Sequence, residues 1–193
     1  MVNSNITNLS RWKSVLGLLG IMWLIHLANL LLGYQLNQFG LVPRTTSHFT
    51  AIFYWSFLHG SIDHLLTNSI PFTILGLLVA VRGSYYFFLT TLFISITSGI
   101  VVWLFGRTAI HIGASVLIYG YFGFLISQAW FDRQPLSLII ALIVVITYNG
   151  LIFGIFPNTQ QISWEGHLAG LISGSLMAWL LCKQKPTKKQ LQE

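Results

Sequence analysis

Three polar residue types interrupt the apolar sequence at positions where they could do chemistry together. Ser115 and His167 each begin an apolar stretch, and His64 and Asn68 lie four residues apart in a third one. A serine hydroxyl beside a neutral imidazole is the minimal pair of nucleophile and general base. The imidazole takes the hydroxyl proton as the oxygen attacks a carbonyl and then protonates the leaving amine. An Asn amide and a His N–H could stabilise the resulting oxyanion, so the set suits peptide-bond hydrolysis.

The composition requires that this chemistry take place in a membrane. Hydrophobic residues make up 54% of the 193 residues and charged residues only 7%, whereas soluble domains carry about 25% charged residues. We therefore expect an integral membrane protein with one domain over residues 1–193. The single Cys182 excludes an internal disulfide, and no group of potential ligands has the spacing of a metal site. We expect no metal and no cofactor.

Six apolar stretches predict the elements that position these side chains. They lack the alternation of membrane β-strands, and only helices satisfy the backbone in lipid without closing a barrel. The expected fold is an all-α bundle of six transmembrane helices, with residues 1–14 and 183–193 as tails. The predicted spans are Val15–Leu36, His59–Val81, Tyr85–Phe105, Ser115–Trp130, Leu136–Phe156 and Gly166–Cys182.

The basic residues predict how these spans are oriented. With six spans, eight of the ten Lys and Arg residues lie on one side, and only Arg44 and Arg107 lie on the other. Because basic residues concentrate on the cytoplasmic side, we expect both termini in the cytoplasm. The net charge of +6 is thus explained by membrane topology, and we expect the lipid bilayer as the partner, with no nucleic acid.

This topology gathers the polar residues in one layer. The second, fourth and sixth spans run in the same direction, so their first turns lie at similar depth near the outer surface. The fourth span has sixteen residues, or about 24 Å of helix against a hydrocarbon core of about 30 Å. Its first residue, Ser115, should therefore lie below the outer surface, where a polar group is costly and usually functional.

Three motifs on these spans resemble those of one family. Residues 59–68, HGSIDHLLTN, resemble the HxxxxHxxxN motif of the rhomboid intramembrane serine proteases. Residues 113–116, GASV, resemble the family's GxSx motif, and residues 166–170, GHLAG, resemble the segment around its catalytic histidine. The loop that follows Pro43 and Arg44 is similar to the long first external loop of bacterial members, which implies a bacterial inner-membrane protein.

The resemblance implies a role for each matching residue. Ser115 would be the nucleophile and His167 the base, without a carboxylate. His64, Asn68 and the Ser115 backbone N–H would form the oxyanion hole. The supporting residues would be Gly113 in the tight loop, Tyr119 against the His167 ring, Gly170 where the sixth helix approaches the fourth, and His59 beside the external loop.

Some residues depart from the family pattern or admit a plainer interpretation. Val116 follows the nucleophile where many members have Gly, and it could narrow the cavity or stiffen the turn. Arg44 is the candidate for an arginine that some members carry in the first loop. His64 and Asn68 share a helix face and could also hold helices together. His26 is interpreted as a packing or interfacial residue.

Two residues near the motifs are interpreted apart from the chemistry. His111 lies close to Ser115 in sequence, but the pattern places the base on the sixth helix. Glu165, together with Trp164, is interpreted as an anchor at the membrane interface, with tuning of His167, two residues away, as the less favoured alternative.

The function predicted from the sequence is cleavage of transmembrane segments in other membrane proteins. One alternative is an inactive rhomboid-like protein that binds membrane clients, although such relatives typically lack the Ser or the His. Another is a small transporter, although the paired repeats and broken helices of transporters are not evident.

Overall fold

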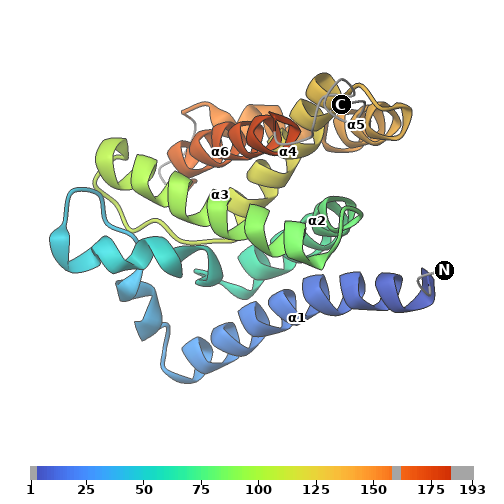
Figure 1. Ribbon diagram of the computed structural model, residues 1–193. Helices are drawn as coiled ribbons and strands as arrows, with labels where there is room; N and C mark the ends of the chain where they lie inside the picture. Colours follow the sequence, from blue (N-terminus) through green and yellow to red (C-terminus); the bar gives the residue numbers. More distant parts are fainter. Residues whose placement is uncertain (1–3, 158–161, 184–193) are drawn as a thin grey trace.

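The computed structural model describes residues 4–157 and 162–183, and all regular elements in this part of the chain are helical (Figure 1). The α-helices are α1 (Ser4–Leu31), α2 (Ile62–Ala80), α3 (Ser84–Phe105), α4 (Ser115–Asp132), α5 (Pro135–Tyr148) and α6 (Trp164–Lys183). The 3₁₀ helices are η1 (Gln35–Phe39), η2 (Thr46–Phe53), η3 (Trp55–Phe57) and η4 (Asn149–Ile155).

Several helix ends differ from the prediction. The first helix begins at Ser4, so residues 4–14 of the expected N-terminal tail are helical. The second helix begins at Ile62, where Ser61 caps it by accepting the backbone N–H of His64 at 3.1 Å. His59 therefore lies in the preceding loop and not in the helix. A polar N-cap determines where a helix begins, and hydropathy alone does not show this position.

The predicted fifth span also divides in two. Residues Pro135–Tyr148 form α5, and the following residues Asn149–Ile155 tighten into η4. The fourth helix begins at Ser115 as predicted and continues to Asp132, two residues beyond the predicted end. At 18 residues it is about 27 Å long, which is still shorter than a hydrocarbon core of about 30 Å. Of the predicted tail over residues 183–193, only Lys183 belongs to the described residues.

Helix α4 is the centre of the bundle and packs most closely on α6. One face of α6 carries Gly170 and Gly174, and a Cβ atom at either position would collide with a backbone carbonyl of α4, that of Val116 or that of Gly120. Such small residues let two helix backbones approach each other in a membrane, where little hydrophobic force drives association. The close approach fixes the register between the starts of α4 and α6.

Four helical segments in the described residues are long and apolar enough to cross a membrane: Leu9–Leu31, Ile62–Ala80, Ser84–Phe105 and Pro135–Ile155. Helices α4 and α6 do not meet this criterion. Because α4 is largely enclosed by its neighbours, its composition is set by protein contacts more than by lipid. The helical membrane bundle is thus confirmed, whereas the count of six spans is not.

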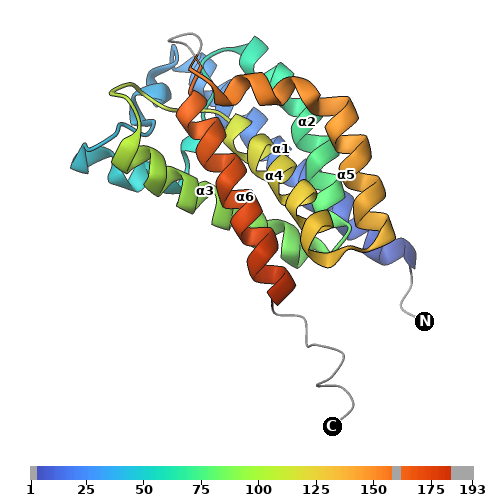
Figure 2. The same ribbon diagram turned by 90° about the horizontal axis from the view of Figure 1, so that it is seen from above.

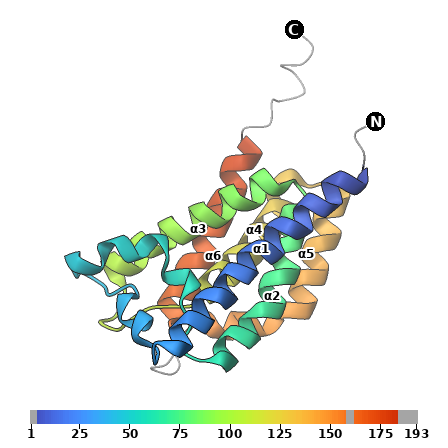
Figure 3. The same ribbon diagram turned by 90° about the horizontal axis from the view of Figure 1, so that it is seen from below.

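The starts of α2, α4 and α6 gather at one end of the bundle, next to the loops (Figure 2). The start of α1, the end of α6 and the turn between α4 and α5 lie at the opposite end (Figure 3). Helices α2 and α5 both pack against α4. The arrangement places Ser115, His64, Asn68 and His167 in one layer of the bundle.

Candidate active site

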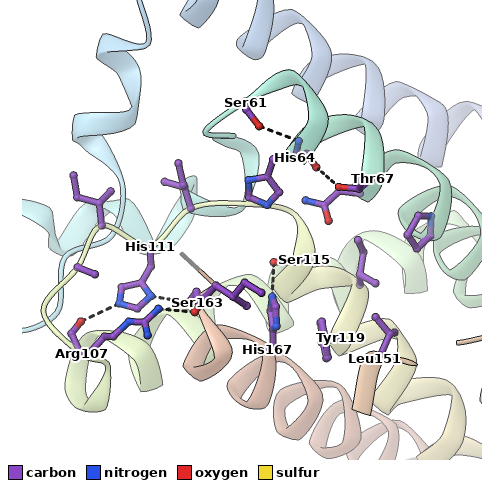
Figure 4. A pocket seen from close by; sticks show the side chains of 17 residues that line it. Ser61, His64, Thr67, Arg107, His111, Ser115, Tyr119, Leu151, Ser163 and His167 are labelled. Carbon is purple, nitrogen blue, oxygen red and sulfur yellow. Dashed lines mark hydrogen bonds between the residues drawn. The ribbon is translucent and has the colours of Figure 1, made fainter. Parts of the chain in front are cut away.

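Ser115 and His167 lie within hydrogen-bond distance although 52 residues separate them in sequence. Their atoms Oγ and Nε2 are 2.9 Å apart (Figure 4). Ser115 is the first residue of α4, and His167 lies in the first turn of α6. The glycine contacts between these helices bring the two first turns together. This distance is the one expected between a nucleophile and its general base.

The other nitrogen of His167 determines which tautomer is present. Nδ1 lies 2.9 Å from the carbonyl oxygen of Gly154, and a carbonyl can only accept a hydrogen bond. Nδ1 therefore carries the proton, and Nε2 is left to accept the hydroxyl proton of Ser115. The Tyr119 ring stacks on the imidazole at a centroid distance of 4.1 Å and an interplanar angle of 8°. A backbone carbonyl and an aromatic ring thus orient the base without a carboxylate.

Gly113 has the conformation and the space that the loop before Ser115 requires. Its φ of 121° lies in the region that favours glycine. A Cβ atom there would lie 2.7 Å from Cε1 and 2.8 Å from Nε2 of the His64 ring. The backbone N–H of Gly113 donates to the carbonyl of Trp55 at 3.1 Å. The loop is therefore held against the segment before α2, and the His64 ring lies directly over it.

His59 contacts the loop that precedes Ser115. It is fully buried, and its Nε2 accepts the backbone N–H of Ala114 at 3.2 Å. Its Nδ1 lies 3.3 Å from the carbonyl of Phe57, to which it donates. Burial lowers the pKa of His59 to about 3, so the ring is neutral and can accept at Nε2. His59 therefore contacts the loop that precedes Ser115, whereas its expected place was beside the external loop.

His64 and Asn68 project from α2 into a cavity of about 700 Å³ that also exposes Ser115 and His167. Figure 4 shows the His64 side chain above Ser115. Asn68 is buried, and its Nδ2 has no hydrogen-bond partner among the described residues. The first N–H groups of a helix also lack intrahelical partners, which leaves that of Ser115 available. His64, Asn68 and Ser115 thus border the same cavity.

His111 belongs to a second chain of hydrogen bonds at the edge of the cavity. Its Nε2 donates to the carbonyl of Arg107 at 3.0 Å, so Nδ1 accepts the hydroxyl of Ser163 at 2.6 Å. Ser163 Oγ in turn accepts the backbone N–H of Gly166 at 3.3 Å, within the first turn of α6. Burial lowers the pKa of the His111 ring and keeps it neutral. His111 therefore positions the start of α6 and does not contact Ser115.

Glu165 differs from its interpretation as an interfacial anchor. Its side chain is only 11% exposed, and Oε1 lies 3.6 Å from Nε of Arg107. The Arg107 guanidinium also donates to the carbonyl of Ile162. The buried Glu165 carboxylate thus pairs with Arg107 in the loop between α3 and α4. Sequence spacing could not reveal this pair, because the two residues are 58 positions apart.

Other residues singled out in the sequence lie outside the site. Val116 is buried against α6 and does not line the cavity, so it does not narrow it. Arg44 donates to the carbonyl of Gly106 at 2.8 Å and thereby fastens the first loop to the end of α3. His26 is buried with its ring edge-on to Tyr34 at 5.8 Å, in keeping with a packing residue.

Trp55, Ser163 and Arg107 support the site without having been predicted. For Ser163 a signal was present, since a serine directly before an apolar helix is a typical N-cap. For Trp55 and Arg107 no local signal exists, because each acts through a backbone carbonyl or a distant partner.

Comparison with known proteins identifies the family of the chain. A model of the Rhomboid domain matches residues 46–184. An uncharacterized protein of Mycobacterium tuberculosis (strain ATCC 25618 / H37Rv) is 32% identical over 188 residues, which cover 91% of this chain and 78% of the relative. An uncharacterized protein of Mycobacterium leprae (strain TN) is 31% identical over 196 residues, with coverages of 95% and 78%.

A plant relative carries the family in its name. Rhomboid-like protein 11, chloroplastic, of Arabidopsis thaliana is 29% identical over 143 residues, which cover 66% of this chain and 51% of that protein. The resemblance predicted from the three motifs is confirmed, since the family model spans all three of them. Together with the four apolar helices, this match shows that the chain is a multi-pass membrane protein of the rhomboid family.

Proposed function

We propose that the protein is an intramembrane serine endopeptidase that cleaves transmembrane segments of other membrane proteins. The observation that carries the proposal is the 2.9 Å contact between Ser115 Oγ and His167 Nε2, in a ring whose Nδ1 is occupied by the Gly154 carbonyl. A serine that served only helix packing would bond a carbonyl one turn back, whereas Ser115 faces an imidazole in a cavity.

The reaction follows from this arrangement. His167 Nε2 accepts the hydroxyl proton as Ser115 Oγ attacks the scissile carbonyl, and the imidazolium is stabilised by the Gly154 carbonyl at Nδ1. The tetrahedral oxyanion is bound by Asn68 Nδ2, the His64 ring and the backbone N–H of Ser115. His167 then protonates the leaving amine, and a water molecule hydrolyses the acyl-enzyme by the reverse sequence with the same base.

The proposed topology makes this cavity accessible from outside. Six spans with both termini in the cytoplasm of a bacterial inner membrane would put the starts of α2, α4 and α6 near the outer surface. A substrate helix would be cut near its outer end, after local unwinding, because a helix hides its amide bonds. The rhomboid resemblance implies that a cap loop near Gly154 to Gln161 moves when a substrate enters; this loop is described only to residue 157, and residues 158–161 lie outside the described part.

The test is cleavage of a model single-pass substrate by the purified full chain in proteoliposomes. Ser115→Ala and His167→Ala should each abolish cleavage and labelling by a fluorophosphonate probe, and the double variant should equal either single one because the pair acts as a unit. Ser175→Ala is a matched control, since that hydroxyl donates to the Leu171 carbonyl within α6 and lies two turns from His167.

Cleavage at the wild-type rate by a folded Ser115→Ala protein would refute the mechanism. Stable binding of the substrate by the wild-type protein with no cleavage under any lipid composition would favour the alternative of an inactive client-binding protein.

A further inference from the structure

A second cavity of about 330 Å³ lies at the opposite end of the bundle from Ser115. It is bounded by the end of α2, the end of α4 and the start of α5. Gln128 and Ser115 are 13 residues apart on α4, which corresponds to about 20 Å along the helix. The proposed chemistry at Ser115 does not use this cavity. Its volume is at the lower end of the range for small-molecule sites, about 300–1,000 Å³.

One basic residue lines the cavity. Arg82 lines it, and Nη1 of Arg82 is buried without a hydrogen bond among the described residues. The guanidinium carbon lies 5.5 Å from the centroid of the Tyr86 ring, which holds the group in place. A buried donor of a charged group is costly when it is left unpaired, and arginine geometry suits the oxygens of a phosphate.

The same cavity contains a carboxylate surrounded by neutral donors. Oδ2 of Asp132 accepts the Ser137 hydroxyl at 2.9 Å and the Gln128 amide at 3.3 Å, and Oδ1 accepts the backbone N–H of Gln134 at 3.0 Å. These contacts fix the carboxylate but leave its charge uncompensated. The structure records no ion pair between Arg82 and Asp132, although both side chains line the cavity. A ligand of one sign would neutralise only one of them.

The remaining walls are apolar and reach the surface of the bundle. Leu78, Leu125 and Ile140 line the cavity, and so do Leu136 and Val81, which are exposed on the outside of the bundle. A soluble ion needs no such surface, whereas the first carbons of an acyl chain do. The site therefore combines a fixed cation, a fixed anion and an apolar exit at one end of membrane-crossing helices.

We propose that this cavity binds the headgroup of a phospholipid with a primary amine, its phosphate on Arg82 and its ammonium on Asp132. The lipid headgroup would lie among the end of α2, the end of α4 and the start of α5, which bound the cavity. On the proposed topology this end faces the cytoplasm. The proposal does not depend on catalysis, so a failure of the Ser115 mechanism would leave it standing.

Native mass spectrometry of the full chain in detergent, titrated with dioleoyl lipids, tests the headgroup. Phosphatidylethanolamine supplies both charges, phosphatidylcholine has a cation that cannot donate a hydrogen bond, and phosphatidylglycerol lacks the cation. We expect phosphatidylethanolamine to bind roughly tenfold more tightly than either, the value of one charge-assisted hydrogen bond. Equal binding of the three lipids by the wild-type protein would overturn the proposal, and this outcome needs no variant.

Substitutions then locate the site. Arg82→Gln should lose about tenfold in phosphatidylethanolamine affinity, Arg82→Lys should retain most of it, and Asp132→Asn should erase the preference over phosphatidylglycerol. Arg133→Gln is the matched control, because Arg133 is an exposed arginine at the same end that does not line the cavity. Equal losses in Arg82→Gln and Arg133→Gln would show nonspecific attraction and refute the site. Displacement of the lipid by millimolar inorganic phosphate would refute a lipid as the ligand.

Discussion

Asn68 offers a sharp separation of chemistry from helix packing. Its Nδ2 is buried and has no partner among the described residues, yet its side chain borders the cavity that contains Ser115 and His167. A residue that joined helices would use this amide in the resting protein. A residue that binds an oxyanion would leave the amide unused until the charge develops.

The two interpretations predict different magnitudes for Asn68→Ala. An unsatisfied buried polar group costs about 1–3 kcal/mol, so its removal offsets the packing lost on truncation, and the net change in unfolding free energy should stay within about 1 kcal/mol. Loss of an oxyanion donor reduces kcat by about 10²–10³, or roughly 3–4 kcal/mol. Because His64 remains as a second side-chain donor, we expect the lower end of that range, and a larger loss in the double variant with His64→Ala.

The assay pairs kcat for a model transmembrane substrate with Tm in the same detergent. Thr67→Val is the matched control, since Thr67 also lines the cavity but its hydroxyl donates to the α2 backbone at the Asp63 carbonyl. The control should keep its turnover. An Asn68→Ala protein that melts early but retains its activity per folded molecule would refute the reasoning and make Asn68 a packing residue.

Two further predictions concern stability and topology. His59→Ala should lower Tm, because the buried N–H of Ala114 loses its acceptor at a cost of about 1–3 kcal/mol, and an unchanged melting curve would contradict the assigned hydrogen bond. A reporter fused after Glu193 should be active only in the cytoplasm, as the eight-to-two distribution of basic residues predicts. Activity of that reporter on the outer side would exclude six spans with a cytoplasmic N-terminus.

The helical bundle and the grouping of site residues could be predicted because their signals are periodic or compositional. Long apolar stretches indicate spans, and a shared direction of α2, α4 and α6 places their first turns in one layer. The end of a helix is harder to predict, since it depends on single caps such as Ser61, whose hydroxyl accepts one N–H. The number of spans is also harder to predict, because the composition of α4 and α6 reflects their contacts with other helices more than contact with lipid.

The orientation of the base could not be predicted from the sequence. It rests on the carbonyl of Gly154, and every residue has a carbonyl, so no residue type marks the position. The support of the Ser115 loop by the Trp55 carbonyl has the same character, whereas the Arg107–Glu165 pair joins charged side chains that are too far apart in sequence for a local signal. These contacts follow from the path of the backbone, which a motif does not encode.

The contact between His167 and Gly154 also makes the proposed reaction depend on the position of η4. Gly154 lies in η4, directly before the segment that reaches the start of α6, and a Cβ atom at this glycine would collide with the Tyr119 hydroxyl. If η4 moved away from the bundle, Nδ1 would lose its acceptor, and the imidazole could rotate or exchange tautomers. The hydroxyl of Ser115 would then have no prepared base. The proposed protease would be reactive only while η4 is seated against the bundle, so the position of η4 would switch the Ser115–His167 pair on and off.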